Sequence, residues 1–329
     1  MRVVVTGGAG FVGRAVVERL HHRGDEVVAL VRDPARARHL VHDAGGNGSA
    51  IELVRSSLAD TGSLRDAMRG ADAVIHVAGM YRVGISASER PAMWDANVGT
   101  TERVLDAAIA GGVPRIVDIS TVNVFGNTNY AVVDEAYRRD LAMGFLSFYD
   151  ETKYRADEAA EARIAHGAPI VIVMPSQVYG PHDHSLASEQ LHGAFHGTLR
   201  YRAFTSLGAG WVHVQDLAEG ILAALDRGVV GERYCLAGPN HTMGDSIAIA
   251  ARVGGKRVPR VELPTALARF AAPLNDALGG LPGMPANLRE TIAAGDGVTY
   301  WASHANATRE LGFEPRSLEQ GIVDTWGSQ

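Results

Sequence analysis

The chain has 329 residues, of which 46% are hydrophobic and 21% are charged, as is typical of a globular protein with a large core. The formal net charge of −6 argues against a nucleic-acid or membrane-surface role, because either role requires a basic face. A single cysteine, Cys235, excludes an intrachain disulfide and fits a reducing compartment. No apolar run approaches the ~18 residues of a membrane span. We therefore expect a cytoplasmic chain with no nucleic-acid partner and no membrane partner.

In the first half of the chain, short β-branched segments alternate with helical patterns. The strand patterns lie at 2–6, 26–31, 51–56, 72–78, 115–120 and 169–174, and the helical patterns lie at 11–23, 61–69, 90–111 and 148–166. This strict alternation predicts right-handed βαβ units and a doubly wound parallel sheet of the α/β class. After about residue 175 the alternation ends. A helix at 216–228, loops and short helical patterns then predict a smaller, mostly helical C-terminal lobe.

The first predicted strand leads into a glycine-rich turn, TGGAGFVG, that opens the first helix. Gly7, Gly10 and Gly13 permit a tight turn, close approach to a pyrophosphate, and close packing of helix on strand. The free N–H groups of the helix attract phosphate. We predict a dinucleotide site here, with a purely structural turn as the alternative. Residues 1–178 would then form a Rossmann-type domain, to which 211–236 returns, and 179–210 with 237–329 would form the substrate-binding lobe.

The residue after the second predicted strand indicates which dinucleotide is bound. An acidic side chain at this strand tip would bind a ribose 2′-hydroxyl, whereas Arg32 suits a 2′-phosphate. Arg36 and Arg38 would add positive charge, although a solvated surface cluster is the alternative. Asp33 follows directly and offers an acidic group for the ribose instead. On balance the sequence favours NADP over NAD.

The segment FYDETKYRAD places Tyr149 four residues before Lys153, so both side chains lie on one side of a helix. A tyrosine has an ordinary pKa of about 10, and a nearby ammonium group favours its phenolate and lowers that pKa. Such a tyrosine exchanges a proton with a carbonyl or alcohol oxygen. The alternative is an ordinary packed tyrosine beside a surface lysine. Ser120 and Thr121 follow the fifth strand pattern at the sheet edge where ligands bind in α/β folds.

These motifs together resemble the extended short-chain dehydrogenase/reductase family, and most closely its dihydroflavonol-reductase-like and hopanoid-associated epimerase-like branch. TGGAGFVG, HVAG (76–79), YDETK, PSQVYGP (175–181) and WVHVQDLAEGI (211–221) occur in the family's order. The resemblance implies a homodimer that pairs the helices at 90–111 and 148–166, and it implies roles for individual residues. The catalytic residues would be Thr121, Tyr149, Lys153 and Asn97; the substrate contacts Tyr81, Thr121, Asn123 and Tyr149; and the cofactor contacts Gly7, Gly10, Phe11, Val12, Gly13, Arg32, Ser57, Leu58, Val77, Ala78, Gly79, Tyr149, Lys153, Pro175 and Val178.

The chain departs from the family pattern at points that bear on function. Ser56, Ser57 and Leu58 replace the usual Gly-Asp-Leu near the adenine, and Met174 stands where nucleotide-sugar members usually carry arginine. We also find no diphosphate-binding signature between 180 and 212. The sequence thus favours an NADP-dependent oxidoreductase that transfers a hydride between NADPH and a carbonyl or alcohol. The alternatives are a nucleotide-sugar epimerase or dehydratase with tightly bound NAD(P), and a non-catalytic NADP-sensing regulator.

The remaining polar clusters have ordinary interpretations. His182, Asp183, His184, His192 and His196 are close in sequence, but they show no clear ligand geometry, and we predict no metal site. We expect His213 to begin a strand and to make a structural hydrogen bond, and Cys235 to be a buried thiol. An apolar stripe on the helix at 90–111 is consistent with the dimer that the resemblance implies.

Overall fold

A seven-stranded parallel sheet forms the centre of the molecule, as the alternating pattern predicted. The computed structural model describes the chain except residues 39, 41–50, 281–283 and 328–329. The strand order is β3 (Ile51–Arg55), β2 (Glu26–Val31), β1 (Arg2–Thr6), β4 (Ala73–His76), β5 (Ile116–Ile119), β6 (Ile170–Pro175) and β9 (Arg233–Leu236). The order reverses between β1 and β4, and ligands bind in α/β sheets at the carboxyl ends of the strands beside such a reversal.

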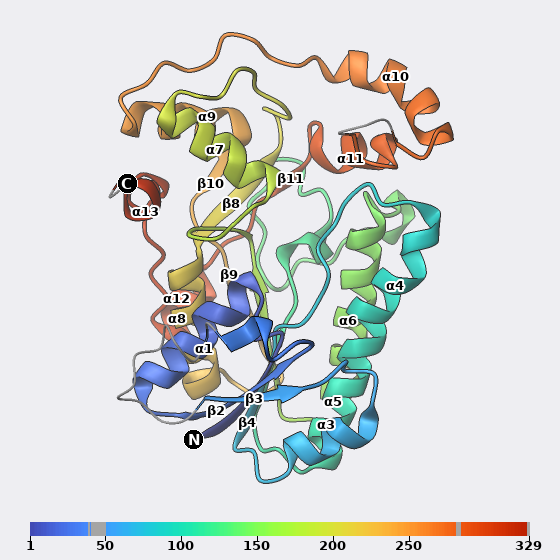
Figure 1. The fold of residues 1–329 in the computed structure, drawn as a ribbon, viewed down its shortest axis with the longest axis vertical. Helices are drawn as coiled ribbons and strands as arrows, with labels where there is room; N and C mark the ends of the chain where they lie inside the picture. Colours follow the sequence, from blue (N-terminus) through green and yellow to red (C-terminus); the bar gives the residue numbers. More distant parts are fainter. Residues whose placement is uncertain (39, 41–50, 281–283, 328–329) are drawn as a thin grey trace.

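Helices cover both faces of this sheet (Figure 1). One face carries α1 (Phe11–Arg23), α8 (Val214–Arg227) and α12 (Ala305–Leu311), and the other carries α3 (Thr61–Met68), α5 (Thr100–Ala110) and α6 (Phe148–Ala165). Alternate residues of each strand enter opposite cores; Val3 and Val5 face α1, whereas Val4 faces the other layer. Because both faces are covered, the strands are almost wholly apolar, which is why they appeared as continuous β-branched segments in the sequence.

The helix expected over 90–111 is interrupted. The structure has α4 (Arg90–Trp94), a π-helical turn over Asp95–Gly99, and then α5. The apolar stripe predicted on this helix, including Val104 and Leu105, is fully buried within this chain against the sheet. Those side chains are therefore core residues, and they give no support to a dimer interface.

The second lobe is built on a small sheet above the main one (Figure 1). Its strands are β7 (Gln177–Tyr179), β8 (Gly208–His213), β10 (Asn240–Thr242) and β11 (Thr299–Tyr300). Of the segment expected to return to the dinucleotide-binding domain, α8 and β9 join the main layers, whereas β8 pairs within the small sheet. The lobe's helices are α7 (Leu186–His196), α9 (Met243–Val253), α10 (Thr265–Ala277), α11 (Leu288–Gly295) and α13 (Leu318–Trp326). Elsewhere in the chain, short 3-10 turns lie at Arg36–Arg38, Ala87–Glu89, Val122–Phe125 and Leu141–Met143.

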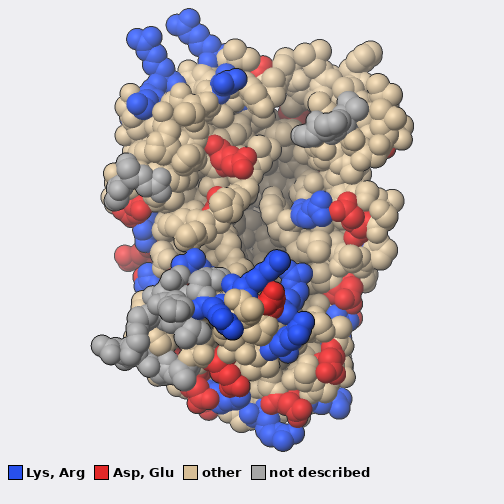
Figure 2. All heavy atoms as spheres, viewed as in Figure 1, with Lys and Arg blue, Asp and Glu red and all other residues tan. Residues whose placement is uncertain are grey.

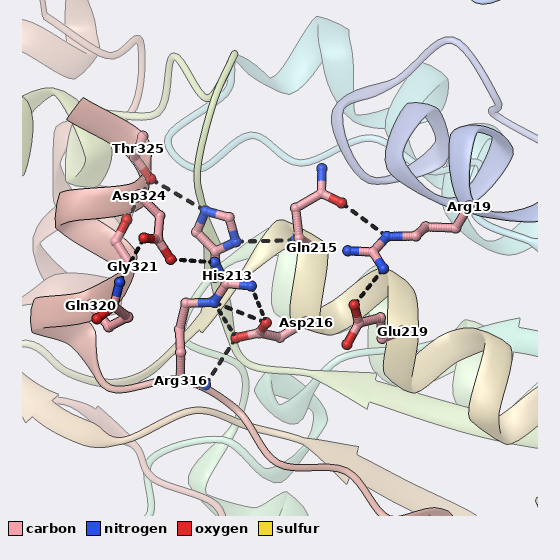
Figure 3. Close-up of polar contacts among 10 residues, drawn as sticks. All are labelled: Arg19, His213, Gln215, Asp216, Glu219, Arg316, Gln320, Gly321, Asp324 and Thr325. Carbon is pink, nitrogen blue, oxygen red and sulfur yellow. Dashed lines mark hydrogen bonds and ion pairs between the residues drawn. The ribbon is translucent and has the colours of Figure 1, made fainter. Parts of the chain in front are cut away.

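A polar cluster joins the start of α8 to the C-terminal segment (Figure 3). Asp216 accepts hydrogen bonds from the backbone N–H and the guanidinium of Arg316, at 2.6–3.0 Å. His213 ends β8 and caps α8 by accepting from the N–H of Gln215, so the prediction that it begins a strand is wrong. Its predicted structural hydrogen bonding is confirmed, since Nε2 also lies 3.3 Å from the Thr325 hydroxyl.

The other clusters named in the sequence have structural surroundings. The His192 and His196 rings lie 4.4 Å apart, and His192 packs edge-on against Trp326 of α13. Over the part of the chain that the structure describes, no group of three or more His, Cys, Asp or Glu side chains has a metal-binding arrangement. Cys235 is a buried free thiol, as predicted, and burial raises its pKa. Among the described residues, no helix is long and apolar enough to span a membrane.

Candidate active site

The glycine-rich turn lies at the carboxyl end of β1, and its glycines have different constraints. A Cβ atom on Gly13 would lie 2.2 Å from the carbonyl oxygen of Gly7, and one on Gly7 would lie 2.8 Å from Cα of Ala78. The fold itself therefore excludes side chains at Gly7 and Gly13. Gly10 is exposed, has an ordinary φ of −77°, and would bring its Cβ no closer than 3.2 Å to any protein atom. Its bare surface leaves room for a group outside the turn, as the expected pyrophosphate requires.

The end of β2 bears on the choice of cofactor. Arg32 is exposed directly after Val31. Asp33 uses its Oδ1 atom to accept from the N–H groups of Ala35 and Arg36, at 3.0 and 3.4 Å, and so caps its own turn. The register of β2 with β3 places Arg55 opposite Val31, next to Arg32. Sequence reasoning missed Arg55, although the expected pairing of consecutive strands was the signal that could have found it.

The turn after β3 is strained where the adenine was expected. Leu58 is buried and has a φ of +60°, a conformation that non-glycine residues rarely adopt. The Ser56 hydroxyl accepts a hydrogen bond from the N–H of Leu58 at 3.1 Å, and Arg103 donates to the carbonyl of Leu58 at 2.9 Å. Ser57 remains exposed at the strand end. Strain of this kind gathers at ligand sites, and here the surrounding hydrogen bonds hold it in place.

A buried hydrogen-bonded network fixes the end of β4. His76 joins Thr6 of β1, at 2.7 Å, to Thr101 of α5, at 3.1 Å. The Thr101 hydroxyl donates its proton to the carbonyl of Asn97, so the Thr101 oxygen accepts from His76 Nε2–H. The His76 Nδ1 atom then accepts from the Thr6 hydroxyl. Burial lowers the pKa of His76 to about 3, which keeps this ring neutral. The network holds 77–79, the expected cofactor segment, against the glycine-rich turn.

Asn97 lies at the centre of the π-helical turn and connects three segments of chain. Its side chain accepts from the N–H of Met80 at 2.6 Å and donates to the Met80 carbonyl at 3.0 Å. It also donates to Thr152 of α6 at 2.9 Å, and Thr152 donates to the carbonyl of Tyr149. Asn97 therefore positions the loop after β4 and the first turn of α6.

The first turn of α6 brings Tyr149 to the end of β5. Ser147 caps the helix by accepting from the Asp150 N–H, and the Arg139–Asp150 ion pair, with N–O 2.8 Å, is almost fully buried beside it. The Thr121 hydroxyl lies near enough to the Tyr149 phenol to lower its pKa, whereas Ser120 donates to Asp157 at 2.6 Å. The structure therefore brings Thr121, and not Ser120, to Tyr149. Thr121 also lies 3.4 Å from the carbonyl of Pro175 and 3.2 Å from Asn123.

Lys153 lies one turn along α6 and donates to the carbonyl of Ile119 at 2.9 Å. Two buried carboxylates face its ammonium group, Asp118 of β5 and Asp157 of α6. Burial lowers the pKa of Lys153, and these carboxylates oppose the shift. Burial also raises the pKa of Asp118 to about 7, although Lys153 opposes it. Sequence reasoning missed Asp118; a charged residue inside an otherwise apolar strand was the signal.

Tyr149 itself is held in its protonated form. Burial raises its pKa well above the ordinary value, the Tyr81 ring adds to this shift, and the Thr121 hydroxyl only partly opposes it. The Lys153 amine donates to the Ile119 carbonyl and faces Asp118 and Asp157, and its lowering of the Tyr149 pKa stays a prediction.

A hollow opens on one face of the molecule (Figure 2). Figure 2 shows this hollow between the two lobes, with Lys and Arg side chains gathered at its lower margin. The exposed Tyr81 ring lies edge-on to Tyr149, with centroids 4.7 Å apart. Pro175 ends β6 at the same edge of the sheet, and Val178 follows in β7, which pairs with β8 in the small sheet. The predicted cofactor and substrate residues therefore surround one site at the carboxyl edge.

A doubly wound sheet with a phosphate-binding turn and a tyrosine–lysine pair at one edge defines a class of nicotinamide-dependent enzymes. The chain belongs to the NAD dependent epimerase/dehydratase family, whose model matches residues 3–237. This confirms the family that the motifs indicated, and its members include oxidoreductases and epimerases.

Relatives with several different names match most of this chain. The chain is 29% identical over 281 residues to sterol demethylase protein B of Methylococcus capsulatus, covering 84% of this chain and 82% of that protein. It is 28% identical to the 4-hydroxy-2-methyl-3-oxo-4-farnesyl-3,4-dihydroquinoline-1-oxide ketoreductase of Stigmatella aurantiaca, covering 98% of this chain and 95% of that one. The crystal structure of gox2253 superposes with a TM-score of 0.81 at 30% identity, covering 99% and 96% of the two chains.

Proposed function

We propose that the protein is an NADP-dependent oxidoreductase that reduces a carbonyl substrate, with Tyr149 as the proton donor. The observation that carries this proposal is geometric: Tyr149 and Lys153, one turn apart on α6, both reach the carboxyl end of β5, where Thr121 lies. A phenol in this position can donate its proton to a carbonyl oxygen, as the reduction of a carbonyl requires.

The residues around Tyr149 have distinct roles in this reaction. The reduced nicotinamide supplies a hydride when it is bound. Tyr149 donates its phenolic proton to the carbonyl oxygen, and the neighbouring Thr121 hydroxyl helps to orient the phenol and the substrate oxygen. Lys153 places a cation one helical turn away, where it favours the tyrosinate left after proton transfer. Asn97 fixes the helix turn that carries Tyr149.

The preference for NADP rests on charge at the ends of β2 and β3. The register places Arg55 opposite Val31, the residue directly before Arg32, and both arginines are exposed. The nearest acidic group, Asp33, is engaged by its own turn and by Arg36. Two guanidinium groups favour a 2′-phosphate, because arginine binds phosphate through several charge-assisted hydrogen bonds.

We infer that the substrate is an apolar ketone with one or more rings. Tyr81 presents an exposed aromatic face beside Tyr149, and such a face favours ring systems. The relatives named for a sterol and for a farnesyl-quinoline ketone support this class. Tyr81 and Asn123 are the residues that we expect to contact it.

Two other functions remain to be separated by experiment. A nucleotide-sugar epimerase or dehydratase would use the same residues but would return the hydride to its substrate. A non-catalytic sensor would bind NADP without turnover, although the retained Thr121, Tyr149 and Lys153 argue against it.

As to assembly, we infer a homodimer from the family resemblance alone, which a sedimentation measurement of mass would test.

The deciding experiment follows NADPH absorbance with the purified protein and a panel of aromatic aldehydes, cyclic ketones, ring-fused ketones and dihydroflavonols. We expect turnover with NADPH, weaker turnover with NADH, and a loss of about 10²- to 10⁴-fold in Tyr149→Phe. Tyr154→Phe, one turn farther along the same helix, is the matched control and should retain activity. Tight NADP binding without net oxidation of NADPH by any compound would overturn the reductase proposal and make nucleotide sugars the next panel.

A further inference from the structure

Helix α10 exposes large apolar side chains on the face that points away from the protein. Phe270 is 89% exposed, and Leu267, Leu274 and Leu278 are each more than half exposed. Their spacing of three or four residues places them on one side of the helix. Soluble proteins seldom leave such a contiguous large apolar face in water.

The opposite face of α10 already supplies its packing. Ala268 and Ala272 pack on Leu288 and Ile292 of α11, together with Phe204. The small residues of α10 therefore face the protein and the large ones face away from it. A helix that packs only on its own chain would turn its large apolar side chains inward. On α10 the large side chains are on the outer face, where they are available to contact another apolar surface.

The segment leading into α10 carries positive charge along the same upper edge of the molecule as the apolar face (Figures 1 and 2). Lys256, Arg257 and Arg260 are exposed, and none of them makes an ion pair or a side-chain hydrogen bond with any residue that the structure describes. Val261 and Leu263 are exposed in the same segment. Figure 1 shows the segment running along the upper edge of the molecule into α10, and Figure 2 shows Lys and Arg side chains projecting from that edge.

The acidic residues of this region are engaged and do not cancel that charge. Glu262 pairs with Arg202 at 3.0 Å, and Asp276 accepts from the N–H of Leu288 at 2.7 Å. Residues 256–278 contain four basic and two acidic side chains, in a chain whose net charge is −6. The absence of a membrane partner was expected from the chain-wide charge, and this segment departs from that average.

From this combination we propose that α10 and residues 256–263 bind the surface of an anionic lipid bilayer. Exposed apolar side chains flanked by lysine and arginine suit the interfacial region, where the apolar groups enter the acyl boundary and the cations meet lipid phosphates. A helix of 13 residues is about 20 Å long, too short to span, so it lies in the plane of the surface. A second copy of the chain fits less well, because the patch has no free carboxylate to meet its own cations.

Helix α10 lies close to the candidate active site, so contact with a bilayer there would bring the site near the lipid. Glu290 of α11, on which α10 packs, accepts from the N–H of Phe148 at 3.0 Å and from that of Gly84 at 3.3 Å. Phe148 directly precedes Tyr149. The bilayer-binding patch is therefore one helix layer from the site, beside the loop that carries Tyr81, where an apolar substrate would pass from lipid to the hollow.

Flotation with lipid vesicles tests the proposal without reference to activity. The wild-type protein should float with vesicles of phosphatidylcholine and phosphatidylglycerol (3:1), and much less with phosphatidylcholine alone. Phe270→Ser with Leu274→Ser should lower the bound-to-free ratio about tenfold or more. Lys256→Gln, Arg257→Gln and Arg260→Gln together should lower it by at least as much at low salt and remove its salt dependence.

Control variants test whether vesicle binding depends on this surface in particular. Met143→Ser changes an exposed apolar residue elsewhere, and Arg65→Gln, Arg69→Gln and Arg138→Gln together remove equal charge elsewhere; both should bind as wild type does. Tryptophan emission of Phe270→Trp should shift to the blue with the anionic vesicles. No flotation, or flotation unchanged in the α10 variants, would overturn the proposal. So would a fall in mass by sedimentation in Phe270→Ser with Leu274→Ser, because the partner would then be a second copy.

Discussion

At the scale of single residues, charge burial distinguishes the site from the rest of the molecule. Asp118 is enclosed in the central sheet, and its Oδ1 atom has no hydrogen-bond partner in the described part of the chain. Its closest charged neighbours are Lys153 and Asp157. Buried groups of this kind have stability consequences as well as functional ones, because the folded and unfolded states bind protons differently.

Asp118 should make the free energy of unfolding depend on pH. Its pKa is about 7 in the fold and about 3.9 in an unfolded chain, so between these values the native state holds the extra proton. Stability from this group therefore falls as pH rises from 4 to 7, by at most about 1.4 kcal/mol per unit. His76, whose pKa of about 3 is depressed, acts in the opposite direction over the same range.

Comparison with Asp118→Asn cancels the His76 contribution. The stability of wild type minus that of the variant should decline as pH rises from 5 to 7, as measured by urea unfolding at several pH values. Asp66→Asn, an exposed acidic residue on α3, is the control and should give a constant difference. A constant difference for Asp118→Asn would show that this carboxyl is already ionised throughout the range.

Arg32 and Arg55 should together select the cofactor. Removing one charge-assisted contact costs about 1.5–3 kcal/mol, so Arg32→Ala or Arg55→Ala should raise the KM for NADPH by roughly ten- to a hundredfold. The KM for NADH should change little, because NADH has no 2′-phosphate. Arg69→Ala, an exposed arginine directly after α3, is the control. An equal rise in KM for NADPH and NADH in either variant would mean that the changed arginine contributes to general cofactor binding and not to selection of the 2′-phosphate.

At the scale of elements, the sequence predicted the β1 turn and α1 correctly, because local glycine chemistry dictates both. The strands and helices of the first half also lie within a few residues of their predicted bounds, since full burial gives strands a continuous apolar signature. The break near Asn97 was not predictable in this way. A π-helical turn arises from the side-chain bonds of Asn97 to Met80 and Thr152, and both partners are distant in sequence.

The glycine-rich turn gives a prediction that separates folding from binding. Gly13→Ala should lower the melting temperature, because the new Cβ meets the Gly7 carbonyl and overpacking costs about 1–3 kcal/mol. Gly10→Ala should melt as wild type does and yet bind NADPH more weakly. Thermal unfolding and fluorescence titration measure the two effects. Undiminished binding by Gly10→Ala would place the pyrophosphate elsewhere.

At the scale of the whole molecule, Arg316 holds the C-terminal segment to α8. Asp216 is almost fully buried, so Arg316→Leu would leave a carboxylate without its main partner. We expect a loss of about 2–3 kcal/mol in the free energy of unfolding, less than for a fully buried pair because Arg316 is partly exposed. Arg252→Leu, which breaks an exposed pair with Glu319, should change it by less than about 0.5 kcal/mol.

A double variant completes this comparison. With Asp216→Asn already present, Arg316→Leu should cost less than it does alone, since no buried charge is left unpaired. Chemical unfolding of the four proteins measures the coupling. Additive losses would indicate that the two side chains act independently and that the junction in Figure 3 depends on its other contacts.

The sequence by itself determined the parallel sheet, the phosphate turn and the Tyr149–Lys153 pair, because these depend on spacing along one strand or helix. Only the tertiary structure decided which neighbours each side chain meets. It paired Arg55 with the end of β2, placed Asp118 next to Lys153, and left the large residues of α10 facing outward. These outcomes depend on strand register and on the direction of side chains from distant segments, which local patterns do not encode.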